Sequence, residues 1–198
     1  MSEDLKSARH WAREMIEGAL FPGAQAVDAT MGNGHDTLWL CGLVGETGHV
    51  YAFDVQPSAV ENTRARLEEY GCAARATLIC QGHQHMAEYV DAPVDAVVFN
   101  LGWLPGGEKT VTTLCDTTLH AVAAGAELLK PGGLMTICIY PGHPEGARER
   151  DALLGWAREL NSREYDVLLK AYLNQPNQPP MMLAVRRRIR DRKQTSVS

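Results

Sequence analysis

Two side chains of different chemistry frame a short segment that could align an amine for reaction. The segment NLGW runs from Asn100 to Trp103 and follows the apolar run 94–99. The Asn100 carbonyl can accept the N–H groups of an amine and stabilise the positive charge that develops as its nitrogen attacks. The Trp103 ring can stack on a planar base or cover a cation. We therefore predict that Asn100 is catalytic and that Trp103 contacts the substrate; the alternative is a turn cap and a core aromatic.

The loop YPGHPEG, residues 140–146, offers a candidate general base. Histidine is the side chain best suited to take a proton from an amine near neutral pH, and His143 lies in the middle of this loop. Tyr140 precedes it at the end of another apolar run. We predict that both are catalytic and that His143 also contacts the substrate. The alternative is that Pro141 and Pro144 only shape the loop and that His143 is solvated.

An acidic turn with two glycines predicts a cofactor site. Gly32 and Gly34 allow positive φ and a close approach of ligand to backbone. The turn lacks the third glycine of the dinucleotide fingerprint, and its acidic residues suit an ammonium group better than a phosphate. S-adenosylmethionine carries both an ammonium and a sulfonium group, so it is the predicted cofactor; the alternative is a plain tight turn. The predicted contacts here are Asp28, Gly32, Asn33, Gly34, Asp36 and Thr37. Asp36 and Thr37 are also expected to cap the helix that follows.

The ends of the next two apolar runs supply further predicted cofactor contacts. Asp54 follows the run 48–53, where an acidic residue commonly binds ribose hydroxyls, and Gln56 adds an amide. The run 76–80 ends near Gly82 and His83, which are candidates for the adenine pocket. His85 lies two residues beyond His83, but no third ligand is near, so no metal site is predicted.

Alternating apolar runs and helical patterns must bring these segments to one edge. The expected strands are 24–30, 48–55, 76–82, 94–102, 134–142, 165–174 and 180–188, and the expected helices are 3–20, 36–44, 57–70, 110–129 and 145–161. Strand–helix alternation predicts a Rossmann-like α/β fold with a mostly parallel sheet and helices on both faces. The last two strands lack a helix between them, so they should form an antiparallel hairpin. Such a seven-stranded layout is typical of class I methyltransferases.

Composition favours one globular domain in a reducing compartment. The chain has 198 residues, 45% of them hydrophobic and 22% charged, and no apolar segment long enough to span a membrane. Five scattered cysteines without a CxxC pair favour the cytoplasm. Residues 186–198 hold six Lys/Arg and one Asp, while the whole chain has a net charge of -5. We therefore expect a single domain over 1–185 and a basic tail over 186–198, which contacts nucleic acid or is only solvated.

Together, five segments resemble one known family. They are DATMGNGHDT (28–37), AFDVQ (52–56), GHQHM (82–86), NLGWLPGGEKTVTT (100–113) and YPGHPEG (140–146). In this order, over roughly residues 5–185, the chain resembles the YtqB/MnmM family of class I methyltransferases, long labelled rRNA methylases. The paired signatures NLGxLPGG and YPGHPEG are specific. Two positions depart from the family pattern: GHQH stands at 82–85 where Ser-His-Glu-Asn is expected, and Trp103 stands where tyrosine is commoner.

The resemblance implies a cofactor, an activity and a substrate. It implies S-adenosylmethionine as methyl donor and a tRNA substrate, methylated on the aminomethyl group of 5-aminomethyl-2-thiouridine at the wobble position. It also places the loop after Asn100 on the substrate side, with Pro105 and Gly107. The alternatives are methylation of rRNA or of a small-molecule amine, and a non-catalytic binding relative. A homodimer is an open expectation.

Overall fold

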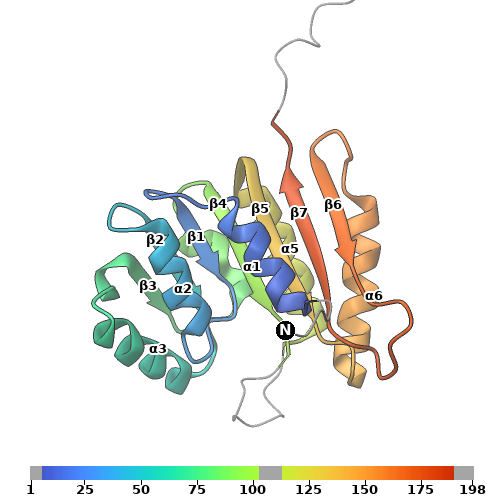
Figure 1. Ribbon diagram of the computed structural model, residues 1–198, viewed down its shortest axis with the longest axis horizontal. Coiled ribbons are helices and arrows are strands. Elements are labelled where there is room, and N and C mark those ends of the chain that lie inside the picture. Colours follow the sequence, from blue (N-terminus) through green and yellow to red (C-terminus); the bar gives the residue numbers. More distant parts are fainter. Residues whose placement is uncertain (1–5, 103–112, 190–198) are drawn as a thin grey trace, which may run out of the picture.

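Seven strands form one sheet in the order β3-β2-β1-β4-β5-β7-β6 (Figure 1). The computed structural model describes residues 6–102 and 113–189. The strands are β1 (Gln25–Asp28), β2 (His49–Phe53), β3 (Ala76–Ile79), β4 (Val94–Asn100), β5 (Leu129–Ile139), β6 (Tyr165–Lys170) and β7 (Met181–Arg187). The first five pair in parallel, whereas β7 is antiparallel to both β5 and β6. The predicted fold class and terminal hairpin are confirmed.

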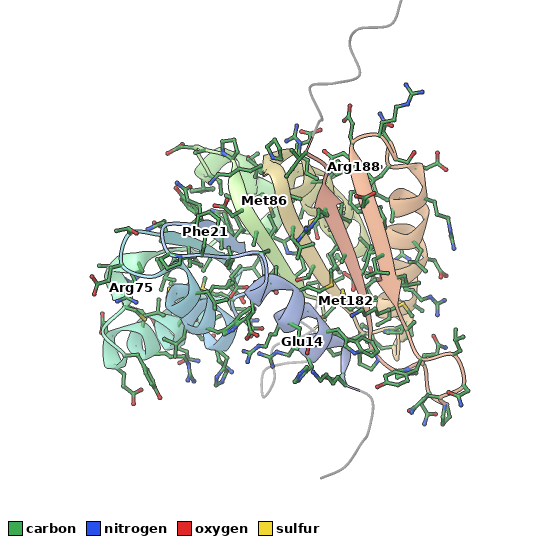
Figure 2. All side chains as sticks on the ribbon, turned by 45° about the horizontal axis from the view of Figure 1, so that its top comes forward. Glu14, Phe21, Arg75, Met86, Met182 and Arg188 are labelled. Carbon is green, nitrogen blue, oxygen red and sulfur yellow. The ribbon has the colours of Figure 1, made fainter. Side chains whose placement is uncertain are left out.

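Helices cover both faces of the sheet (Figure 1). They are α1 (Ala8–Glu17), α2 (His35–Val44), α3 (Pro57–Glu69), α4 (Met86–Tyr89), α5 (Cys115–Leu128) and α6 (Pro144–Glu159), with short 3-10 turns η1 (Ala73–Arg75) and η2 (His83–His85). One core holds buried residues of α1, α2 and α3, and the other holds buried residues of α4, α5 and α6. Met182 belongs to the first core and Met86 to the second (Figure 2).

The central strand β4 is buried on both faces, so only its carboxyl end can reach a ligand. All of β4 except its last residue, Asn100, is buried, as a strand covered on both faces should be. β1 and β4 are neighbours, although β2 and β3 lie between them in the chain. The strand order therefore reverses at β1, where the carboxyl ends of β1 and β4 meet. Ligands of open α/β sheets bind at such a switch point.

Two predicted boundaries were wrong. The first helix is shorter than 3–20, and it begins after Ser7, whose Oγ accepts the His10 N–H. The segment 130–133 does not follow a helix as a loop but lies inside β5. β7 ends at Arg187, within the predicted strand 180–188, so its last two residues belong to the segment 186–198 expected as a tail. Arg187 donates to the carbonyls of Glu127 and Leu129, which ties the start of the predicted tail to the end of α5.

Three further observations concern the class of protein and not the candidate site. Within the described residues, none of the helices has the length and apolar character needed to cross a membrane. The same residues contain no group of three or more His, Cys, Asp or Glu side chains able to hold a metal ion. All five cysteines are free thiols; Cys80 is exposed and the others are buried.

Candidate active site at the carboxyl edge

The turn after β1 has the predicted backbone geometry. Gly32 has φ +52° and Gly34 has φ +78°, both in the left-handed region that favours glycine. Gly34 is also the N-cap residue of α2. A Cβ atom at Gly34 would lie 2.9 Å from Thr63 Cα, so this glycine allows α3 to pack closely against the turn. Asn33 strengthens the same contact, because its side chain accepts from Asn62 and its carbonyl accepts from Arg66.

Asp54 lies directly beside this turn, at the end of β2. Its carboxylate accepts the N–H of Gly32 at 3.0 Å and the N–H of Gln56 at 3.0 Å. Burial raises the pKa of Asp54, although these backbone hydrogen bonds oppose the shift. Each carboxylate oxygen can accept a second hydrogen bond. The half-buried Asp54 therefore has the acceptors needed to bind a ribose next to the glycine turn, and Gln56 begins α3 just beyond it.

Asp28 is too deeply buried to contact a ligand directly, so the prediction for its side chain was wrong. It is fully buried and accepts hydrogen bonds from Thr37 Oγ1 at 2.7 Å and from the Thr30 N–H at 3.2 Å. Burial and the charge of Asp36 raise the pKa of Asp28 to about 7. Thr37 is also buried, and its hydroxyl joins β1 to α2 rather than capping the helix.

Asp36 has a different role from the predicted helix cap and ammonium ligand. Its Oδ1 accepts from Arg9 at 2.9 Å and from Arg13 at 2.5 Å, and its Oδ2 accepts from Asn100 Nδ2 at 2.7 Å. Burial would raise the pKa of Asp36, but the hydrogen bonds and charges of both arginines outweigh it and lower that pKa. The Asp36 carboxylate is therefore neutralised by α1 and is nearly closed to solvent, with 7% of its side chain exposed.

Asn100 is held by two contacts at the end of β4. Its backbone N–H donates to Thr30 Oγ1 at 2.7 Å, which joins β4 to the loop after β1. Its side-chain Nδ2 donates to Asp36, and because an ionised carboxylate can only accept, the NH₂ end of the amide must face Asp36. The carbonyl end then faces the other way. The amide of Asn100 is thus fixed with its carbonyl oxygen, a hydrogen-bond acceptor, on the side away from Asp36.

The arginines that fix this arrangement were not found from the sequence. Arg9 and Arg13 are four residues apart on α1, so they project from one face of the helix. That spacing was a visible signal of a paired cationic face. Nothing local to the sequence, however, connects α1 with Asp36, which lies 23 and 27 residues further on.

The predicted adenine contacts are only partly supported. His83 is 7% exposed, donates from Nδ1 to the Ala29 carbonyl at 3.2 Å and packs edge-on against Phe99. Burial lowers the pKa of His83. Its side chain is therefore a core group, which contradicts the predicted base contact. Gly82 precedes it in an extended conformation, and its neighbour Gln84 folds over it.

The loop after β5 places its histidine in a helix cap. His143 is the N-cap residue of α6, and its Nδ1 accepts the Gly146 N–H at 3.1 Å. A nitrogen already used as an acceptor is poorly placed to take a proton, so the structure argues against His143 as the general base. Tyr140 is half-buried near Arg9, and burial raises the pKa of its hydroxyl.

Two glutamates of α6 bind the first turn of α5, and the sequence analysis assigned no role to either. Gly102 and Thr113 are joined by two hydrogen bonds, which close the base of this loop. Glu145 accepts the N–H of Cys115 at the start of α5. Glu149 is buried and binds Thr118 Oγ1 at 2.7 Å. Trp103, Pro105 and Gly107, the predicted substrate contacts, lie outside the described residues.

Known proteins are similar to this chain in sequence. The family model described as "Putative rRNA methylase" matches residues 50–186. The chain is 36% identical over 195 residues to "tRNA (mnm(5)s(2)U34)-methyltransferase, chloroplastic" from Arabidopsis thaliana, covering 92% of this chain and 70% of the relative.

Solved structures agree with the sequence matches. One described as a putative rRNA methylase from Clostridium thermocellum has a TM-score of 0.91 and 38% identity, over 93% of this chain and 99% of that one. Another, a putative methyltransferase from Streptococcus mutans in complex with SAH, has a TM-score of 0.85 and 37% identity, with the same coverage. This chain therefore belongs to the rRNA methylase family of class I methyltransferases.

Proposed function

We propose that this protein is an S-adenosylmethionine-dependent methyltransferase that acts on the aminomethyl group of 5-aminomethyl-2-(thio)uridine at the tRNA wobble position. The observation that carries this proposal is the amide of Asn100, whose NH₂ end is held by Asp36 and whose carbonyl is thereby presented as an acceptor. An amine has N–H groups that such an acceptor can bind, so that the nitrogen lone pair is aimed, whereas a carbon nucleophile has no N–H to bind. The tRNA substrate is supported by the name of the Arabidopsis relative.

The residues of the glycine turn fit the proposed cofactor. Gly32 and Gly34 take positive φ, and Asp54 is held against the turn by the Gly32 N–H. Its remaining lone pairs suit the two hydroxyls of a ribose. When bound, S-adenosylmethionine supplies a methyl group on a positively charged sulfur. On the adenine side Gly82 remains the proposed contact, because the side chain of His83 is buried in the core.

The protein's own part in the reaction is mainly orientation. Asn100 accepts an N–H of the neutral amine through Oδ1 and so aims the nitrogen lone pair. As positive charge develops on that nitrogen, the same hydrogen bond strengthens. Asp36, Arg9 and Arg13 act through Asn100, because they fix its amide and do not themselves need to touch the amine. They are positioning residues in this proposal.

The direct test is methylation of defined RNAs by the purified protein. An anticodon stem-loop that carries 5-aminomethyl-2-thiouridine should gain one methyl group per molecule, detected by mass spectrometry of its nucleosides. The matched controls are the same stem-loop with uridine at that position, an rRNA fragment and a simple primary amine. Methylation of the rRNA fragment or the simple amine, with the modified stem-loop unchanged, would replace this substrate by one of the alternatives.

Two further parts of the proposal concern assembly and compartment. β6 is an edge strand whose Val167, Leu168 and Leu169 are each more than 40% exposed. Unpaired backbone groups and exposed apolar side chains at such an edge suit pairing with a second copy about a two-fold axis. We propose this homodimer, with light scattering of the purified protein as the test.

Five free thiols support a reducing compartment, and we propose the cytoplasm.

A further inference from the structure

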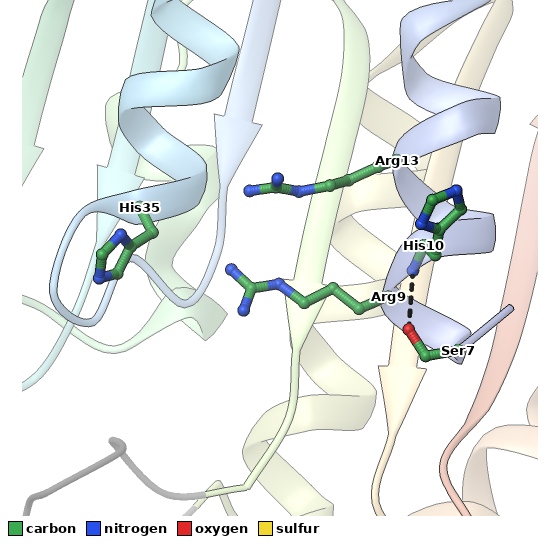
Figure 3. Close-up of a pocket in the computed structure, with 5 residues that line it drawn as sticks. All are labelled: Ser7, Arg9, His10, Arg13 and His35. Atoms are coloured by element: carbon green, nitrogen blue, oxygen red, sulfur yellow. Dashed lines mark hydrogen bonds between the residues drawn. The ribbon is translucent and has the colours of Figure 1, made fainter. Parts of the chain in front are cut away.

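A basic cavity lies beside the candidate active site, between α1 and the start of α2. It has a volume of about 440 Å³ and is lined by Ser7, Arg9, His10, Arg13 and His35. We call it the arginine pocket. Figure 3 shows Arg9 and Arg13 reaching from α1 toward the side of the pocket where His35 stands. Among the described residues, none of those that line the cavity is acidic, although the chain as a whole has a net charge of -5.

The charge of the pocket is positive because one carboxylate faces two guanidinium groups. Asp36 accepts one hydrogen bond from each arginine, so about one positive charge is left over. Burial and the neighbouring charge of Arg66 lower the pKa of His35, so the arginines rather than this histidine carry the charge. A cavity with a net positive charge is suited to bind an anion.

Both arginines are preorganised and still have free donor capacity. A guanidinium has five N–H donors, and each arginine donates one hydrogen bond to Asp36. Arg13 is further held by stacking on Trp39, with its Cζ 4.8 Å from the ring centroid. The side chains remain 47% and 38% exposed for Arg9 and Arg13. Little side-chain entropy is left to lose when an anion binds, and the fork geometry matches phosphate oxygens.

The position of the pocket indicates which anion it serves. A single carboxylate, Asp36, separates the arginines from the Asn100 amide. In a pyrimidine nucleotide in the anti conformation, the C5 edge faces the nucleotide's own 5′-phosphate. A nucleotide whose C5 substituent reaches Asn100 would thus bring a backbone phosphate toward the adjoining cationic cavity.

We propose that the arginine pocket binds a backbone phosphate of the RNA next to the nucleotide that is methylated. This inference rests on the proposed function for the nature of the substrate, and it adds a binding site on α1. It explains how an acidic protein binds RNA: the positive charge is concentrated beside the reacting group rather than spread over the surface.

The test is RNA binding by Arg9→Gln at several salt concentrations, with S-adenosylhomocysteine present and an unmodified anticodon stem-loop as the probe. Arg13 still pairs with Asp36 in this variant, so the clamp on Asn100 is retained. We expect the RNA affinity to fall about tenfold, the loss of one charge-assisted hydrogen bond pair. The slope of log affinity against log salt should decrease by about 0.7, as for one lost contact to a single strand. The Kd for S-adenosylhomocysteine should not change.

Two control variants isolate the pocket from net charge. Arg158→Gln removes one exposed positive charge on α6, on the opposite face of the sheet, and should bind RNA as the wild type does. Arg9→Lys keeps the charge and should recover most of the salt slope. If Arg9→Gln and Arg158→Gln behave alike, the inference is wrong.

The remaining outcomes separate this inference from the proposed function. If Arg9→Gln weakens S-adenosylhomocysteine but not RNA, the pocket holds the cofactor's carboxylate and the inference fails. If the wild-type protein does not bind the stem-loop, the inference about the arginine pocket fails as well. If the wild type binds RNA through Arg9 but methylates no RNA carrying 5-aminomethyl-2-thiouridine, the proposed function fails and the phosphate site stands.

Discussion

At the scale of single residues, one carboxylate organises the candidate site. Asp36 joins α1, through Arg9 and Arg13, to the end of β4, through Asn100. Its lowered pKa keeps it ionised, so it remains an acceptor and cannot donate to the Asn100 carbonyl. The orientation of the Asn100 amide therefore follows from the charge of a neighbouring group rather than from the shape of a pocket.

Replacing Asn100 by alanine should separate catalysis from cofactor binding. If its carbonyl aims the amine, Asn100→Ala should lower kcat about 100-fold or more, because the lost bond matters most as charge develops on nitrogen. The Kd for S-adenosylmethionine should stay nearly the same by calorimetry. Asn161→Ala, which removes an amide from the turn before β6, is the matched control and should retain full activity. Equal loss of cofactor binding and turnover would instead assign Asn100 to the cofactor pocket.

The residue-level predictions from sequence were confirmed where they concerned backbone conformation. Gly32 and Gly34 have the positive φ that their spacing after a strand indicated, and Asp54 lies beside them. The predictions were wrong where a residue distant in the sequence determines the contacts of a side chain. Asp36 lies eight positions after the end of β1 and looks like a helix cap, but Arg9 and Arg13 reach it from another helix. No local pattern contains that contact.

At the scale of elements, the glycine turn is shaped by the helix that packs on it. The sequence suggested that a side chain at Gly34 would occupy ligand space, but the nearest atoms to such a side chain belong to Thr63 of α3. Gly34 therefore serves the packing of α3 against the start of α2. Substitution at Gly34 affects folding before it affects binding.

Gly34→Ala should destabilise the protein much more than Gly71→Ala. Both glycines have positive φ, at +78° and +66°, so each alanine is strained by about 1–2 kcal/mol. At Gly71 the new Cβ meets nothing within 4 Å, whereas at Gly34 it would lie 2.9 Å from Thr63 Cα. Overpacking adds about 1–3 kcal/mol at Gly34 only. Urea unfolding should show this difference, and equal losses would mean that α3 yields without cost.

Asp28 links β1 to α2, and its burial predicts a pH effect on stability. The pKa of this carboxyl is raised from 3.8 to about 7 in the folded protein. Its contribution is fully present below pH ~4 and is lost as the pH rises through about 7. Asp28→Asn is neutral at every pH, so it should gain stability over the wild type by about 1.4 kcal/mol per pH unit between pH ~4 and ~7. Urea unfolding at several pH values measures this, and parallel curves would contradict it.

The sequence predicted the elements well because most of them are periodic and apolar. The start of β5 was the exception, because the segment 130–133 contains Pro131 and two glycines, the usual signals of a loop. The structure overrides these signals by pairing Leu129 with Val94 and shifting the register before Ala96. A strand that begins with an irregular register has no periodic pattern by which it could be found.

At the scale of the whole molecule, two positively charged regions, the arginine pocket and the basic residues at the end of β7, lie at opposite ends of the strands. The arginine pocket adjoins Asn100 at the carboxyl edge. β7 runs antiparallel to β5, so its start at Met181 pairs with Ile139 near that edge, while Arg186 pairs with Leu134 at the far side. Arg187 and Arg188 there bind backbone carbonyls of α5 and of the segment before β6. The basic residues at the end of the chain thus begin on the side away from the site.

Two truncations should separate the structural part of the basic end from any part in RNA binding. A chain that ends at Ile189 keeps the bonds of Arg187 and Arg188 and should unfold like the full chain. A chain that ends at Val185 loses the two Arg187 bonds to α5 and should lose about 2–4 kcal/mol. For RNA, the Ile189 chain should bind an anticodon stem-loop within about twofold of the full chain, because a contact made beyond β7 is not needed for a nucleotide at Asn100. A loss of about fivefold or more, with unfolding unchanged, would instead mean that residues 190–198 contribute to RNA binding.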